Sequence, residues 1–217
     1  MHYEILVEDA SGKIALNYIL AKILGPVGQD HTYKIISYKG IGRIPRNLKG
    51  KTDPQKRILL DRLPQLLRGY GKSFQHISAV VVVIVDLDDK DYLMFKQEMV
   101  DILNSCNPQP KTLFRIAIEE GEAWLLGDRN AVKSAYPRAK DQLLNGYLQD
   151  SICGTWEILA DAIYPGGSQK LKRLGWPHVG QAKCEWAKNI APHLDVESNR
   201  SNSFQVFRDG IKSLSET

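Results

Sequence analysis

Residues 77–88 read Ile-Ser-Ala-Val-Val-Val-Val-Ile-Val-Asp-Leu-Asp, and this stretch decides the fold. From Ile77 to Val85 the side chains are almost all apolar, and most are β-branched, which favours an extended backbone. A continuous apolar strand is typical of a parallel sheet that helices cover on both faces. We therefore expect this stretch to form the central strand of an α/β fold.

Weaker strand patterns lie on either side and alternate with helical patterns, which is typical of βαβ units. The predicted strands are Tyr3–Glu8, Thr32–Tyr38 and Thr112–Ile118. Helices are predicted from an N-cap at Ser11 to Gly25-Pro26, from Asp53-Pro54 to about Arg68, and over residues 91–104. No comparable strand pattern follows, so we predict an α/β domain over residues 1–128 and a helical C-terminal region over residues 129–217.

The net charge of +4 on 217 residues is unevenly distributed along the chain. Residues 39–72 contain ten Lys and Arg against two Asp. Such a basic stretch attracts phosphate backbones through counterion release, although a solvated helix face beside a loop is the alternative. We expect four of its side chains to contact nucleic acid: Arg43, Arg46, Lys49 and Lys51.

Several other classes of protein are disfavoured. The longest strongly apolar run, Ala79–Val85, has seven residues, whereas a membrane helix needs roughly 20. The first residues lack the features of a signal peptide, so we expect a cytoplasmic protein without a membrane partner. Three distant Cys indicate neither a disulfide framework nor a zinc site, and the sequence contains no phosphate-binding P-loop, hydrolase elbow or HExxH motif.

Acidic residues follow three of the predicted strands. Glu8 ends the first, Asp86 and Asp88 end the third, and Glu119, Glu120 and Glu122 follow the fourth. Ligands of open parallel sheets bind at the carboxyl ends of the strands, where these acids are expected to meet. In extended backbone, residues two apart face the same side, so Asp86 and Asp88 are predicted to point together. A divalent cation would relieve the repulsion of such a cluster.

These motifs resemble the Toprim domain of topoisomerases, bacterial primases and overcoming-lysogenization-defect nucleases. The segments Ile5-Leu6-Val7-Glu8 and Val85-Asp86-Leu87-Asp88 carry this likeness. The chain is also similar to small stand-alone bacterial Toprim-like proteins of unknown function, for which a role in phage defence is proposed. That similarity lies in Glu120-Gly121-Glu122-Ala123-Trp124-Leu125-Leu126-Gly127-Asp128 and in Ser203-Phe204-Gln205-Val206-Phe207.

The resemblance implies a Toprim or Rossmann-like parallel sheet of about four strands in the order 2-1-3-4. It also implies that Glu8 is the general acid or base, or a metal ligand. Asp86 and Asp88 would then bind Mg²⁺ (or Mn²⁺), and Glu120 and Glu122 would be additional ligands or support them. The chain departs from the family at Asp9, where Gly is usual, so either Asp9 joins the metal cluster or the turn is built differently.

The preferred function is a Mg²⁺-dependent nuclease or phosphodiesterase acting on nucleic acid. The alternative is a Toprim-like module that binds nucleic acid or a nucleotide without turnover and works with a partner, such as an ATPase. Phosphotransfer or pyrophosphatase chemistry on small nucleotides is a third possibility. The tryptophans are expected to pack between helices, with base stacking by Trp176 and Trp186 beside basic residues as the alternative.

Overall fold

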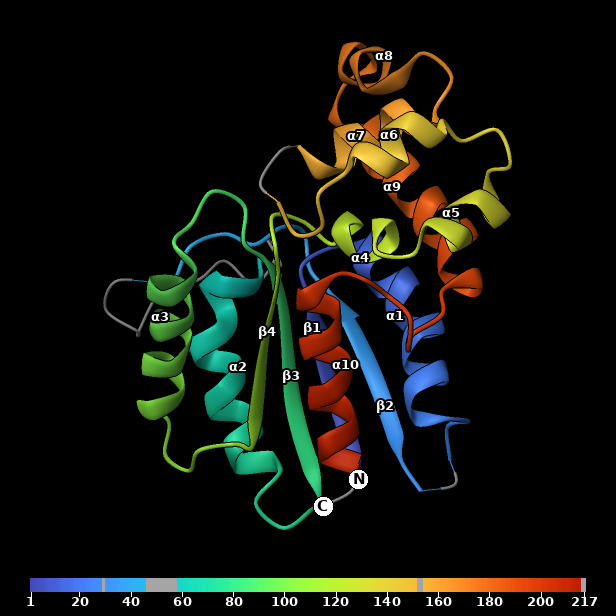
Figure 1. Ribbon diagram of the computed structural model, residues 1–217. Helices are drawn as coiled ribbons and strands as arrows, with labels where there is room; N and C mark the ends of the chain where they lie inside the picture. The colour runs from blue at the N-terminus through green and yellow to red at the C-terminus, as the bar shows by residue number, and fades with distance from the viewer. Residues whose placement is uncertain (29, 46–57, 152–153, 216–217) are drawn as a thin grey trace.

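The computed structural model describes residues 1–28, 30–45, 58–151 and 154–215 and shows a three-layer α/β fold (Figure 1). The first elements are β1 (His2–Val7), α1 (Ala10–Leu24), β2 (Thr32–Ser37), α2 (Leu59–Ser73), β3 (Ala79–Asp86), α3 (Tyr92–Asn104) and β4 (Thr112–Ala117). Within the described residues the strands form one parallel sheet in the order β2-β1-β3-β4. This confirms the predicted α/β class and the strand order.

The central strand β3 is buried on both faces, as its continuous apolar sequence predicts. Val81, Val83 and Val85 enter the core beneath α2 and α3. Their neighbours Val80, Val82 and Ile84 enter the core on the opposite face, which α1 and the last helix, α10 (Asn202–Ser215), cover (Figure 1). The sheet therefore separates two apolar layers.

The remaining helices lie beyond the carboxyl ends of the strands (Figure 1). They are α4 (Glu122–Leu126), α5 (Arg129–Ala135), α6 (Asp141–Gly146), α7 (Thr155–Ile163), α8 (Gly167–Leu174) and α9 (Trp176–Ile190). The short 3₁₀ helix η1 (Ala191–His193) follows α9 and lies beside the last turn of α1, where Lys22 donates to the Pro192 carbonyl at 2.7 Å. The division at residue 128 stays a prediction, but one apolar core crosses it. That core joins Val82 of β3 to Trp186 of α9 and Phe204 of α10.

One predicted helix start differs from the structure, and another lies outside the described residues. The N-cap of α1 is Asp9 rather than Ser11, because the Asp9 carboxylate accepts the hydrogen bond from the Gly12 N–H at 2.7 Å. Ile58 has extended backbone and α2 begins at Leu59. The predicted start at Asp53-Pro54 lies outside the described residues.

None of the helices that the structure describes combines the length and the apolar character needed to cross a membrane.

Candidate acidic site

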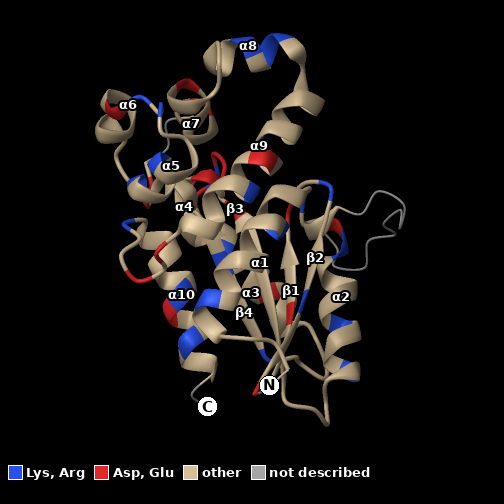
Figure 2. Ribbon diagram, turned by 90° about the vertical axis from the view of Figure 1, so that its right-hand side faces the viewer, with Lys and Arg blue, Asp and Glu red and all other residues tan. Residues whose placement is uncertain are grey.

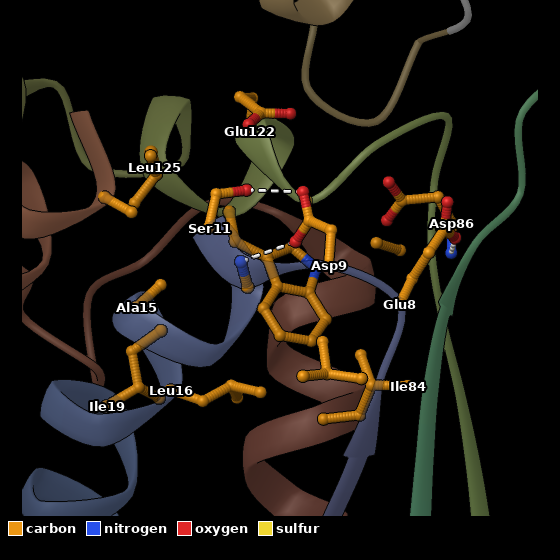
Figure 3. A pocket seen from close by; sticks show the side chains of 16 residues that line it. Glu8, Asp9, Ser11, Ala15, Leu16, Ile19, Ile84, Asp86, Glu122 and Leu125 are labelled. Carbon is orange, nitrogen blue, oxygen red and sulfur yellow. Dashed lines mark hydrogen bonds between the residues drawn. The ribbon is translucent and has the colours of Figure 1, made fainter. Parts of the chain in front are cut away.

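Glu8 and Asp86 meet at the carboxyl edge of the sheet, as predicted. Val7, the last residue of β1, is level with Ile84 of β3, so both acids stand where their strands end. The Asp86 backbone N–H donates to Oε2 of Glu8 at 3.3 Å. Figure 3 shows the two side chains beside each other at the pocket rim. Neither carboxylate forms an ion pair with a residue that the structure describes.

The surroundings of these two acids favour their neutral forms. Burial raises the pKa of Glu8 to about 7, with further contributions from the Asp88 and Asp9 carboxylates, against the lowering effects of the Asp86 N–H and Lys183. Burial, and then the charge of Glu8, raise the pKa of Asp86 well above its usual range. Two neighbouring carboxylates are thus held in a partly buried place with excess negative charge.

The sequence analysis missed the role of Lys183, which α9 inserts into this cluster. Its Nζ lies 2.9 Å from Oε2 of Glu122 and 3.7 Å from Oε1 of Glu120. Only 15% of the Lys183 side chain and 4% of the Glu122 side chain are exposed. Burial opposes a charged ammonium, but the carboxylates of Glu122, Glu120 and Asp86 outweigh it and raise the pKa of Lys183. Lys183 is therefore the internal cation of the acidic cluster.

Asp88 does not follow the geometry predicted for it. The backbone of Asp88 has φ of +51°, so the strand alternation ends at Asp86. The Asp88 carboxylate pairs with Nζ of Lys90 at 2.8 Å. The prediction that Asp86 and Asp88 point together because both are extended is therefore wrong, although the charge of Asp88 still acts on Glu8.

The glutamates after β4 attach the helical region to the sheet. Glu119 accepts hydrogen bonds from the backbone N–H groups of Gly154 at 2.8 Å and Thr155 at 2.9 Å, and from the Thr155 hydroxyl. Glu120 Oε2 accepts from the backbone N–H of Trp156 at 3.2 Å. These carboxylates therefore cap the start of α7, where they also meet the positive end of the helix dipole. Glu120, a predicted metal ligand, is already engaged by Trp156 and Lys183.

Asp9 forms the turn between β1 and α1, at the position where the Toprim-like proteins usually have Gly. Its carboxylate accepts hydrogen bonds from the Gly12 N–H and the Ser11 hydroxyl, each at 2.7 Å (Figure 3). The same residue lines a cavity of about 40 Å³, large enough for one or two water molecules. The acids Glu8, Asp86 and Glu122 line it together with apolar side chains of α1, β3 and α4.

Of the predicted nucleic-acid contacts, only Arg43 belongs to the described residues. It is exposed, and its backbone N–H donates to Oδ1 of Asp61 at 2.9 Å. Arg46, Lys49 and Lys51 lie outside the described residues.

The donor set fits a Mg²⁺ ion that takes few protein ligands. In the described part of the chain, no three or more His, Cys, Asp or Glu side chains are gathered as a metal cage. Mg²⁺ is usually bound by only one or two carboxylates, together with water and substrate phosphate, so such a cage is not required. Glu8 and Asp86 supply two hard oxygen donors that form no ion pair within the described part of the chain, and oxygen donors are what Mg²⁺ and Mn²⁺ select.

The metal-free protein is expected to lose stability as the pH rises from about 4.5 to above 7. Glu8 has its pKa raised from 4.5 to about 7, so in this window the folded protein binds more protons than the unfolded chain. The difference corresponds to at most about 3 kcal/mol of unfolding free energy. Urea unfolding in EDTA measures it, and Glu8→Gln should show a shallower fall. Equal pH slopes for parent and variant would mean that Glu8 titrates normally in the folded state.

Residues 7–212 match the model of a protein family described as "Domain of unknown function (DUF4276)". The matched segment contains Glu8, Asp86, Glu122 and Lys183, so it includes the whole acidic cluster. No curated protein and no solved structure matches the chain.

Proposed function

Because the chain belongs to the DUF4276 family, whose description states no function, we propose an activity from the acidic site itself: a Mg²⁺-dependent phosphodiesterase, or nuclease, acting on nucleic acid. The observation that carries this proposal is the pairing of Glu8 and Asp86 on adjacent strands, without a cationic partner among the described residues. A carboxylate pair at the carboxyl edge of a parallel sheet supports metal-assisted phosphate chemistry.

Each residue has a distinct task in this proposal. Asp86 would hold a Mg²⁺ (or Mn²⁺) ion, and Glu8, positioned by the Asp86 N–H, would accept the proton of the attacking water. A bound cation would neutralise charge on the scissile phosphate and make water a better nucleophile. Lys183 pairs with Glu122 and Glu120, and its charge also lowers the pKa of Glu8 and Asp86, against the larger effect of burial. Asp88, Glu120 and Glu122 remain proposed additional ligands. To bind the cation, each would have to give up its present partner.

Lys183 also favours a second candidate, a binding module without turnover. Its buried ammonium already supplies one positive charge to the cluster, so the site is partly neutralised by the chain itself. Such a module would bind nucleic acid or a nucleotide and work with a partner, such as an ATPase in phage defence. Salt-dependent binding without cleavage in any divalent metal would favour this candidate over the phosphodiesterase.

Incubation of the purified protein with plasmid, single-stranded DNA and RNA tests the proposed function. Cleavage is expected in Mg²⁺ or Mn²⁺ and not in EDTA. Asp30→Asn is the matched control, since Asp30 is exposed and precedes β2 at the opposite end of the strands. If no substrate is cut, or if Asp86→Asn cuts as fast as Asp30→Asn, the proposal fails.

Mg²⁺ is also expected to raise the melting temperature of the parent protein. A ligand that binds only the folded state at ten times its dissociation constant adds about 1.4 kcal/mol of stability. For a chain of this size that corresponds to a rise of roughly 3–6 °C. Calorimetry with and without Mg²⁺ should show this rise in the parent and in Asp30→Asn, and none in Asp86→Asn. An unchanged parent across millimolar Mg²⁺ would contradict a cation site.

A further inference from the structure

Trp176 differs from the other tryptophans of the chain. It is the first residue of α9 and is 75% exposed. Trp124, Trp156 and Trp186 are buried, with at most 5% of their surface exposed. The prediction that the tryptophans pack between helices is therefore confirmed for three of them and wrong for Trp176. A large aromatic ring held in solvent by a regular helix is available to contact a ligand.

Basic residues precede this ring closely in the chain, because α8 ends directly before it. Gly175, with φ of +94°, turns the chain from α8 into α9, and its N–H donates to the carbonyls of Leu171 and Lys172. Trp176 thus follows the last turn of α8, which carries Lys172 and Arg173, by only a few residues in the chain. Figure 2 shows the basic residues of α8 in blue. We call this surface the α8–α9 corner and define it by exposed residues: Lys170, Lys172, Arg173, Leu174 and Trp176.

The charge of the α8–α9 corner is only partly compensated. Lys172 pairs with Glu157 at 2.9 Å, and its Nζ lies 5.5 Å above the Trp156 ring. Lys170 and Arg173 form no ion pair with any residue that the structure describes. The corner thus presents at least two uncompensated positive charges beside an exposed aromatic ring, which is complementary to a phosphate backbone with accessible bases.

The corner is physically connected to the acidic site. Trp176 and Lys183 are seven residues apart on α9, so they share nearly one helix face and lie about 10 Å apart along its axis. A second connection runs through α7. The Trp156 ring is 6.3 Å from the Trp176 ring, and the Trp156 N–H donates to Glu120. A strand bound at the corner would therefore lie within a few nucleotides of Glu8 and Asp86.

We propose that the α8–α9 corner binds single-stranded nucleic acid, with one unpaired base stacked on Trp176 and neighbouring phosphates at Lys170 and Arg173. This rests on the proposed function and specifies its substrate class. A base can stack on a protein side chain only when it is unpaired, which excludes a continuous duplex. The large apolar residues exposed on α8 and α9 are only Leu174 and Trp176 among the described residues, too few for an inserted membrane surface.

Binding of a labelled single-stranded oligonucleotide in EDTA, followed by fluorescence anisotropy, tests the corner. Trp176→Ala should bind about tenfold more weakly, which is about 1.4 kcal/mol, while Trp176→Phe keeps a stacking ring and most of the affinity. Leu93→Ala is the matched control, because Leu93 is 74% exposed on α3. Its affinity should equal that of the parent.

The charged residues have their own variant and control. Lys170→Ala with Arg173→Ala should weaken binding and lower the slope of log affinity against log salt by roughly one to two. Lys111→Ala, an exposed Lys at the amino end of β4, should change neither. Because the buried tryptophans are shielded, oligonucleotide quenching of intrinsic fluorescence should largely disappear in Trp176→Phe.

A chemical assay separates this proposal from the proposed function. Hydrolysis of bis(p-nitrophenyl) phosphate in Mg²⁺ needs no stacked base, so Trp176→Ala should retain the parent rate. Loss of oligonucleotide binding in Trp176→Ala supports nucleic-acid binding at the α8–α9 corner even if the small diester is not hydrolysed. In that case only the proposed phosphodiesterase activity is contradicted. Equal oligonucleotide affinity of parent and Trp176→Ala overturns the corner even if the diester is hydrolysed. Equal affinity for duplex, or preference for phosphatidylserine vesicles, also overturns it.

Discussion

Lys183→Met is expected to destabilise the folded protein by about 3–5 kcal/mol at pH 7 in EDTA. The substitution keeps much of the side-chain volume but removes the only positive charge found to act on all of Glu8, Asp86, Glu120 and Glu122 among the described residues. Breaking a buried ion pair on one side leaves an uncompensated charge, which is the costly case. Urea unfolding measures the loss, and exposed Lys188→Met on the same helix is the matched control.

A double-mutant cycle distinguishes charge from packing in this prediction. If the loss comes from unpaired carboxylates, adding Glu122→Gln to Lys183→Met should recover part of it, because the closest carboxylate becomes neutral. Lower pH should also reduce the loss, since protonation neutralises the remaining acids. A loss below about 1 kcal/mol, or one that is the same at pH 5 and pH 8, would mean that Lys183 contributes by packing alone.

The difference between the predicted and the observed site has a physical cause. Glu8 and Asp86 could be located because each follows a strand whose apolar pattern is unambiguous, and parallel strands bring their carboxyl ends together. The position of Asp88 could not be predicted, because it depends on the left-handed backbone of Asp88 itself, two residues after the end of β3. Local sequence cannot determine whether an acid continues the strand or turns toward Lys90.

Lys183 could not be located from the sequence because long-range packing determines its position. It lies 61 residues after Glu122 in the chain, on a helix whose place depends on contacts with α1. The helical pattern is equally uninformative about Trp176, since Trp176, Val179 and Trp186 all fall near one face of α9. Val179 and Trp186 are buried, whereas Trp176, the first residue of the helix, is exposed.

The fold was predictable to a greater extent than the site. Ala79–Asp86 carries enough continuous apolar sequence to require cover on both faces, and the structure provides it with α2 and α3 on one side and α1 and α10 on the other. The helix starts were less certain, because Asp9 and Ser11 are both good N-caps and compete for the same turn. The choice of Asp9 follows from its bond to the Gly12 N–H.

Asp86→Asn is expected to lower Mg²⁺-dependent phosphodiesterase activity at least about 100-fold, and Asp88→Asn less than about fivefold. The family resemblance implies that Asp86 and Asp88 are both Mg²⁺ ligands, whereas the geometry separates them. Asp86 lies beside Glu8 without a cationic partner among the described residues, and Asp88 is paired with Lys90. Removing a charged group that holds the catalytic cation costs much of the electrostatic stabilisation of the transition state.

Glu8→Gln completes this comparison, since its amide oxygen can still accept the Asp86 N–H but cannot take a proton from water. Loss of a general base typically costs about 10²–10⁴ in rate, so Glu8→Gln should match or exceed the loss in Asp86→Asn. Single-turnover cleavage at saturating Mg²⁺, with folding verified by circular dichroism, measures all three variants. If Asp88→Asn loses as much activity as Asp86→Asn, the cation must draw Asp88 away from Lys90, and the paired arrangement is then not the active one.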